Sequence, residues 1–169
     1  MHEVILVDEN DNEVGTGDKI KTHQEGKLHR AFSIFVFNSK GELLLQKRVK
    51  SKYHSGGLWT NTCCSHPRPG EHIEKAVHRR LREEMGFDCD LREVTNFTYK
   101  AELGELTEHE FDHVFIGFYD GEIRPDENEV DDFKFVTMDE LRANIAKNPE
   151  NYTAWFLIAM KNIDWNSLR

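Results

Sequence analysis

The sequence predicts an α/β (α+β) fold in which helices cover a mixed or largely antiparallel β-sheet. Two observations favour this class: short runs rich in β-branched and aromatic residues, and helical patterns placed between and after them. At 169 residues the chain has the length of one domain and is long enough to bury a core of its own. We therefore expect a single domain over residues 1–169.

The elements are expected in the following order. A short apolar run at residues 4–7 ends in a polar turn at 9–12. Residues 31–37 and 42–46 predict paired strands, because the polar residues 38–41 between them have hairpin turn chemistry. Residues 71–85 predict a helix, and 96–101, 111–119 and 133–136 predict strands. A helix over 138–147 should end at Asn148-Pro149, and the almost uniformly apolar residues 152–162 predict a last helix packed on the sheet.

Composition restricts the class of protein and of partner. The chain has no apolar run near the length of a membrane span and no export signal, so we expect a cytoplasmic location and no membrane partner. Three cysteines, an odd number, favour reduced thiols over a disulfide framework. A net charge of −9 argues against nucleic acid as a partner and leaves a small anion possible. The sequence leaves a monomer and a homodimer equally open.

The segment Thr60-Asn61-Thr62-Cys63-Cys64-Ser65-His66-Pro67 places a thiol two residues before an imidazole. A thiolate can take or give a proton, and a neutral imidazole can bind a metal, so one segment could supply both a catalyst and a ligand. The alternative is a small buried cysteine beside a surface histidine.

The helix at 71–85 carries charge on its apolar side. Arg80 and Glu84 fall in the sector of the residues expected in the core: Ile73, Ala76, Val77, Leu81 and Met85. Because a buried charge is costly unless it is paired or binds an ion, Glu84 is a candidate cation ligand and Arg80 a candidate anion clamp. A structural ion pair at the edge of the core is the alternative.

Glu108-His109-Glu110 forms a second cluster. In an extended segment both carboxylates would lie on one face, about 7 Å apart along the strand, with His109 on the other. Such a pair would raise each other's pKa, which favours a shared metal or one protonated general acid; an acidic loop at 105–110 is the alternative. With His23, His29 and His66 these carboxylates would suit a divalent metal such as zinc or manganese. We assign surface or satisfied roles to the remaining histidines: His2, His54, His72, His78, His109 and His113.

Residues 65–87 resemble the Nudix box. The pattern is matched at Glu71, Arg79, Leu81, Glu83, Glu84, Gly86 and Phe87. Ser65 stands where the box has Gly, and Arg80 stands where it has a glutamate that Nudix hydrolases use to bind catalytic metal. The second departure should weaken pyrophosphohydrolase chemistry and provide a contact for substrate phosphate.

Together with residues 28–33, 59–67 and 108–110, the altered box resembles the type 1 isopentenyl-diphosphate isomerases, over about residues 4–155. This resemblance implies a Nudix-like α/β/α sandwich around a mixed sheet. It also implies interconversion of isopentenyl and dimethylallyl diphosphate, in isoprenoid biosynthesis, through proton addition at one carbon and removal from another.

The resemblance further implies residue roles. One divalent metal (Zn, Mn or Mg) would be bound by His23, His29, His66, Glu108 and Glu110. Glu84, with the backbone carbonyl of Cys64, would bind a Mg²⁺ that arrives with the diphosphate. Glu110, assisted by Tyr99, would protonate the double bond and Cys64 would remove the proton. Trp155 would face the carbocation, and the diphosphate would be contacted by Lys19, Arg48, Lys52, Ser65 and Arg80.

We choose Cys64 over Cys63 as the reactive thiol because it stands two residues before His66. Adjacent residues of an extended segment face opposite ways, so Cys63 should pack in the core. Two other functions stay open: a Nudix hydrolase of a nucleoside or sugar diphosphate, and a metal-dependent binding module without turnover.

Overall fold

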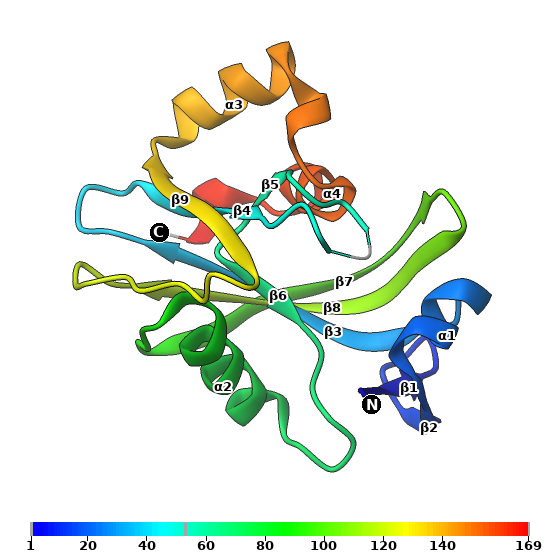
Figure 1. Ribbon diagram of the computed structural model, residues 1–169. Helices are drawn as coiled ribbons and strands as arrows, with labels where there is room; N and C mark the ends of the chain where they lie inside the picture. Colours follow the sequence, from blue (N-terminus) through cyan, green and yellow to red (C-terminus); the bar gives the residue numbers. More distant parts are fainter. Residues whose placement is uncertain (1, 53, 169) are drawn as a thin grey trace.

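The computed structural model describes residues 2–52 and 54–168, and a mixed β-sheet of nine strands runs through this part of the chain (Figure 1). The strands are β1 (Glu3–Val7), β2 (Glu13–Asp18), β3 (His29–Phe37), β4 (Leu43–Arg48), β5 (Trp59–Thr60), β6 (Cys63–Ser65), β7 (Leu91–Leu103), β8 (Leu106–Phe118) and β9 (Val130–Val136). β3 is central: it pairs antiparallel with β1, β4 and β6, and parallel with β8. β7 and β9 extend the sheet through antiparallel pairing with β8 and β4.

Helices lie on both sides of the sheet (Figure 1). α2 (Ile73–Met85) covers one face, and α3 (Met138–Lys147) and α4 (Ala154–Asn162) lie on the other, with α1 (Lys19–Glu25) beside the start of β3. Two short 3-10 helices, η1 (Pro149–Asn151) and η2 (Trp165–Leu168), flank α4. The expected class, an α/β/α sandwich around a mixed sheet, is therefore confirmed.

Two separate hydrophobic clusters fill the space between these layers. Under α2, the cluster includes Phe32, Ile34 and Leu81, and under α4 it includes Phe35 and Phe156. The two sets alternate along β3 because successive side chains of a strand point to opposite faces. Seven of the nine β3 residues are buried, as expected for a strand covered on both sides.

Local signals explain where α2 ends. Gly86 follows its last residue with φ 74°, the left-handed conformation that glycine adopts without strain. A Cβ at this position would also clash with the backbone carbonyl oxygen of Arg124. Glycine is thus required here twice, for the turn and for the close approach of the segment before β9.

The predicted hairpin, the central helix and the helix at 138–147 are confirmed. The predictions missed β2 and α1, whose short polar sequences have little hydrophobic periodicity, and the very short strands β5 and β6. The helix predicted from residue 71 begins at Ile73, and the last helix begins at Ala154 rather than at residue 152. β7 and β8 are much longer than predicted, because many of their outer residues are polar. β8 begins at Leu106, so the acidic segment 108–110 is a strand and not a loop.

Candidate active site

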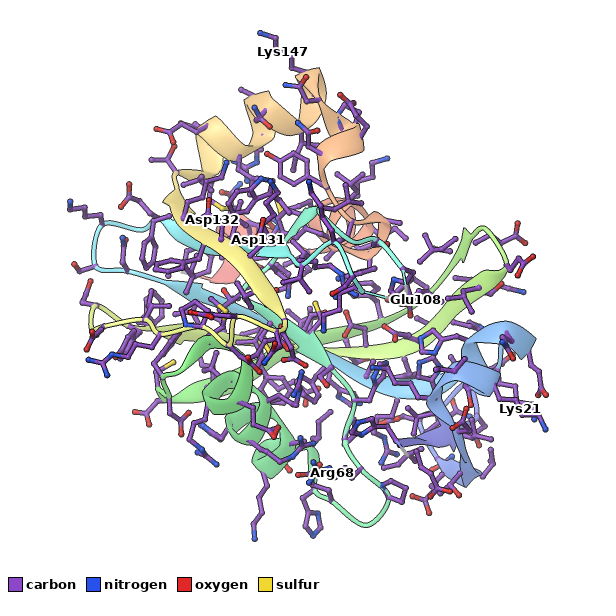
Figure 2. The ribbon with its side chains drawn as sticks, in the orientation of Figure 1. Lys21, Arg68, Glu108, Asp131, Asp132 and Lys147 are labelled. Atoms are coloured by element: carbon purple, nitrogen blue, oxygen red, sulfur yellow. The ribbon has the colours of Figure 1, made fainter. Side chains whose placement is uncertain are left out.

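A polar cavity opens where the ends of β4, β6 and β8 meet α1, α2 and α4. It is lined by Lys19, Arg48, Lys52, His54, Cys64, Ser65, His66, Arg80, Glu84, Glu108, Glu110, Glu129 and Trp155. Figure 2 shows Glu108 between β8 and the segment that joins β4 to β5. Many of the residues singled out from the sequence therefore line one cavity.

Three imidazoles and a carboxylate converge at one end of this cavity. His23 comes from α1, His29 from β3, His66 follows β6, and Glu110 comes from β8, where it lies directly beside His29 in the parallel pairing. One ligand atom of each of the four lies within 4.8 Å of the others. Glu108 joins them through its Oε2, 3.2 Å from Nε2 of His23.

The hydrogen bonds of these histidines show whether a cation fits. Nδ1 of His23 lies 2.6 Å from the carbonyl of Lys19, and Nδ1 of His29 lies 2.9 Å from that of Lys27. A carbonyl only accepts, so both rings carry hydrogen on Nδ1, and in the neutral tautomer Nε2 is a lone pair. Those lone pairs point at carboxylate oxygens at 3.2 and 3.1 Å. Two acceptors at this distance repel unless a proton or a metal cation lies between them, so the donor set suits a metal.

Burial and neighbours set the charge of this cluster. Burial lowers the pKa of His66 to about 4, although its bond to Glu110 acts the other way, so the ring is neutral near pH 7 and available as a ligand. Burial opposes ionisation of Glu110, but the close contacts of its Oε2 with the imidazoles of His29 and His66 outweigh burial and hold the pKa of Glu110 well below the usual value. The mutual rise in pKa expected for a carboxylate pair is therefore wrong for Glu110, because imidazoles are its nearer neighbours.

Cys64 is held as a thiol on the same cavity. Its Sγ donates to Oδ1 of Asn61 at 2.8 Å and accepts from Nε1 of Trp155 at 3.2 Å. Burial, and after it the charge of Asp112, raises the pKa of this thiol. Cys63 points to the other side of β6, into the core under α2.

Tyr99 and Trp155 complete the wall between these groups. The hydroxyl of buried Tyr99 donates to Oε1 of Glu110 across the β7–β8 pair, so Oε2 of the same carboxylate stays with the imidazoles. Trp155 is only 6% exposed, and the guanidinium of Arg48 lies 5.1 Å from its ring centroid. An aromatic face thus lies between the thiol and the cationic end of the cavity.

The cationic end is formed around Arg80. Its guanidinium donates to Oε2 of Glu84 at 2.6 Å, to Oε2 of Glu129 at 3.0 Å and, through Nε, to Oγ of Ser65 at 3.1 Å. Nζ of Lys52 lies 3.6 Å from Glu129. Burial lowers the pKa of Lys19, and the neighbouring charges of Lys52, Arg80 and Arg48 lower it further, which shows that positive charge is concentrated here.

Sequence reasoning missed three residues of this site: His54, Asn61 and Glu129. His54 was assigned a surface or satisfied role, yet its side chain is only 6% exposed and its Nε2 lies 3.0 Å from Glu108. Asn61 lies inside the segment that was singled out, but nothing in its spacing marked it as the partner of the thiol. Glu129 lies in an acidic stretch before β9 that has no distinguishing pattern.

Solved structures share the fold. A protein of Deinococcus radiodurans superposes with a TM-score of 0.73 at 22% identity, covering 86% of this chain and 90% of that one. The MutT protein of Methanosarcina mazei superposes with a TM-score of 0.69 at 20% identity, covering 84% and 96%. The NUDIX domain family matches residues 27–156. Fold and motif thus define a Nudix protein.

Relatives of known name are more similar in sequence. "Isopentenyl-diphosphate Delta-isomerase 2" of Photorhabdus laumondii is 53% identical over 98% of this chain and 94% of its own length. "Isopentenyl-diphosphate Delta-isomerase" of Serratia proteamaculans is 49% identical over 98% and 93%. The chain belongs to the Nudix family and, within it, to the isopentenyl-diphosphate Delta-isomerases.

The structure also bears on metal binding and on membrane-spanning helices. The described residues hold a histidine and glutamate group able to bind a divalent metal, as expected. Among the same residues, none of the helices has the length and apolar character needed to cross a bilayer.

Proposed function

We propose that this protein isomerises isopentenyl diphosphate to dimethylallyl diphosphate. In this reaction the terminal alkene carbon gains one proton and the carbon nearer the diphosphate loses one, so the composition is unchanged. The observation that carries the proposal is the common cavity of Cys64 and Glu110, with Trp155 beside the thiol and a cluster of cations at one end. Relatives named for this activity, about half identical over nearly the whole chain, support it.

We propose that Cys64 and Glu110 are the base and the acid. Glu110, assisted by Tyr99, gives its proton to the terminal carbon, and a tertiary carbocation forms. Cys64 then takes a proton from the neighbouring methylene, whose C–H electron pair becomes the new double bond. This leaves a carboxylate and a thiol, the charge state favoured in the free site, where burial raises the pKa of Cys64 and the imidazoles lower that of Glu110. One proton must therefore move from sulfur to the carboxylate before the next turnover.

Trp155 has a physical role in this scheme. An alkene is a weak base, so its protonation requires a pocket that stabilises a carbocation without trapping it. An aromatic face meets both needs, since a desolvated cation–π contact contributes about 2 kcal/mol and the indole has no nucleophilic oxygen. The small exposed fraction of Trp155, 6%, supports such a water-poor wall.

The diphosphate is proposed to bind at the cationic end. Its binding energy would hold a small hydrocarbon in register between the acid and the base. Arg80 is the main proposed contact of the diphosphate, because it stands where the Nudix box has a glutamate. It also donates to the hydroxyl of Ser65. Further contacts are proposed for Lys19, Arg48, Lys52 and Ser65.

Two cation sites are proposed. His23, His29, His66, Glu108 and Glu110 would bind one Zn, Mn or Mg ion, which would supply positive charge that fixes the Glu110 carboxylate beside the substrate. Glu84, with the backbone carbonyl of Cys64, would bind a Mg²⁺ that accompanies the diphosphate. Glu84 is buried and accepts a hydrogen bond from the guanidinium of Arg80, and Glu129 accepts from the same group. Two carboxylates in one place support a cation site there.

The setting of the reaction is also a proposal. Cys63, Cys64 and Cys89 are all free thiols, which supports a reducing cytoplasm. A small isoprenoid diphosphate, rather than nucleic acid or membrane, is the proposed partner of a chain with a net charge of −9. We propose that the chain acts as a single domain, either as a monomer or as a homodimer.

Incubation of the purified protein with isopentenyl diphosphate in deuterated water tests the proposal. Mg²⁺ should be present, with and without added Zn²⁺ or Mn²⁺. We expect dimethylallyl diphosphate with deuterium in the new methyl group, and loss of turnover in Cys64→Ala. Release of phosphate or a monophosphate, with no need for Cys64, would instead indicate a hydrolase. Metal binding without any product would refute enzyme activity.

A further inference from the structure

The two carboxylates of the metal cluster have similar surroundings. Glu110 turns Oε2 to His29 and His66 and is bonded at Oε1 by the hydroxyl of Tyr99. Glu108 turns Oε2 to His23 and has Nε2 of His54 at its Oε1, 3.0 Å away. In each case one oxygen faces the metal imidazoles and the other faces an outer partner.

We infer that His54 is the positioning residue of Glu108, the counterpart of Tyr99 for Glu110. This inference rests on the proposed metal site and extends it to a residue outside the donor set. His54 would fix the rotation of the Glu108 carboxylate so that Oε2 stays directed at the metal. Metal-binding carboxylates are normally held by such outer hydrogen bonds, and their removal typically weakens metal binding by about 10- to 100-fold.

The neighbour of Nδ1 is compatible with a hydrogen on Nε2 of His54. Nδ1 of His54 lies 3.3 Å from the hydroxyl of Ser55, which can donate to it. When the hydroxyl donates, the ring carries its hydrogen on Nε2, the atom that lies 3.0 Å from Oε1 of Glu108. This arrangement is the reverse of that of His23 and His29, whose Nδ1 atoms carry the hydrogen and whose Nε2 atoms are free to bind metal. His54 can thus serve Glu108 as a donor. Because His23, His54 and Glu108 also form a group that could hold a metal themselves, the variants below are chosen to separate a positioning role from direct ligation.

Packing fixes the ring in place. His54 contacts Trp155 edge to face, with ring centroids 5.5 Å apart, and its backbone carbonyl accepts from Arg48 at 3.3 Å. Its side chain is only 6% exposed. The segment between β4 and β5 also carries Lys52, so His54 joins the metal cluster to the part of the chain proposed to contact the diphosphate.

Metal affinity without substrate tests the inference. Zn²⁺ or Mn²⁺ binding is measured by competition with a chromogenic chelator, for the original protein and for His54→Ala, His54→Gln and the exposed control His72→Ala. We expect the dissociation constant of the metal to be about 10- to 100-fold larger for His54→Ala and nearly unchanged for His72→Ala. For His54→Gln, whose amide can still donate to Glu108, we expect the affinity to be largely restored. Circular dichroism melting verifies that each variant is folded.

A double-mutant cycle identifies the route of the effect. If His54 acts through Glu108, His54→Ala should add less than a twofold loss in a Glu108→Ala background. Unchanged affinity in the single variant His54→Ala would overturn the inference. An equal loss in His54→Gln and His54→Ala, retained in the Glu108→Ala background, would also overturn it and indicate direct metal ligation. Because no turnover is measured, the result is independent of whether isopentenyl diphosphate is the substrate.

Discussion

The choice between the adjacent thiols gives the sharpest prediction about the chemistry. Cys64→Ala removes the proposed base from the cavity, where the thiol bonds to Asn61 and Trp155. Loss of one acid–base group typically lowers a rate by about 10²- to 10⁴-fold, a rise in the activation barrier of about 3–5 kcal/mol. We expect at least this loss in kcat, because the proposed scheme assigns removal of the methylene proton to this thiol.

Cys63→Ala is the matched control one residue away. Cys63 is 0% exposed and packs in the core under α2, so the change removes one buried atom and leaves the cavity intact. The cost should be about 1 kcal/mol of unfolding free energy, by analogy with one buried methylene, or about 2–4 °C in Tm. Turnover at 25 °C should stay within a few-fold of the original.

The turnover of both variants is measured as product formation from isopentenyl diphosphate in deuterated water, detected by mass spectrometry. Calorimetry gives the Tm of each variant. Metal affinity should be unchanged in both, because neither thiol belongs to the donor set. The reverse ranking, an active Cys64→Ala and an inactive but folded Cys63→Ala, would refute the assignment of the base and the site derived from it.

Three further changes have defined outcomes. Trp155→Leu should lower kcat by about 30-fold, the equivalent of a lost 2 kcal/mol cation–π contact, in a steady-state assay. Arg80→Glu, which reinstates the Nudix glutamate, should raise KM for the diphosphate by at least about tenfold, since a charge-assisted contact is replaced by repulsion. Glu71→Gln should lower the unfolding free energy by about 1–2 kcal/mol at pH 7, since Arg79 bonds both carboxylate oxygens. Those bonds lower the pKa of Glu71 below 4.5, so its contribution is fully present above that pH and is lost as pH falls through the lowered pKa of the folded state. The difference between the two proteins in urea unfolding should shrink as the pH is lowered from 7 into the acid range.

Local periodicity accounts for the parts of the site that could be predicted from the residues alone. Glu108 and Glu110 are two apart on a strand, so both were expected on one face, and both line the cavity. Arg80 and Glu84 are one helical turn apart on the inner side of α2, and they form a direct bond. In each case the positions depend on one element only, whose repeat is visible in the sequence.

Residues positioned by the packing of distant segments could not be predicted in this way. His54 lies between β4 and β5, in a segment without regular periodicity, and it meets Glu108 only because that segment folds over the end of β8. Glu129 reaches Arg80 from the segment before β9, 49 residues along the chain. Ligand chemistry and, after it, family resemblance grouped His23 and His29 with the other donors, and periodicity did not contribute.

The strand β8 shows why spacing predicts position but not charge. Glu108, Glu110 and Asp112 follow at intervals of two and are all buried on one face. Imidazoles lower the pKa of Glu110 despite burial, whereas Asp112, with Ser33 as its hydrogen-bond donor, has its pKa raised by burial and then by the charge of Glu110. One strand therefore carries a carboxylate whose ionisation is favoured, beside the metal donors, and an acidic residue near the thiol whose ionisation is opposed. The partners from β3, α1 and the segment after β6, not the strand itself, determine which acidic residue serves which purpose.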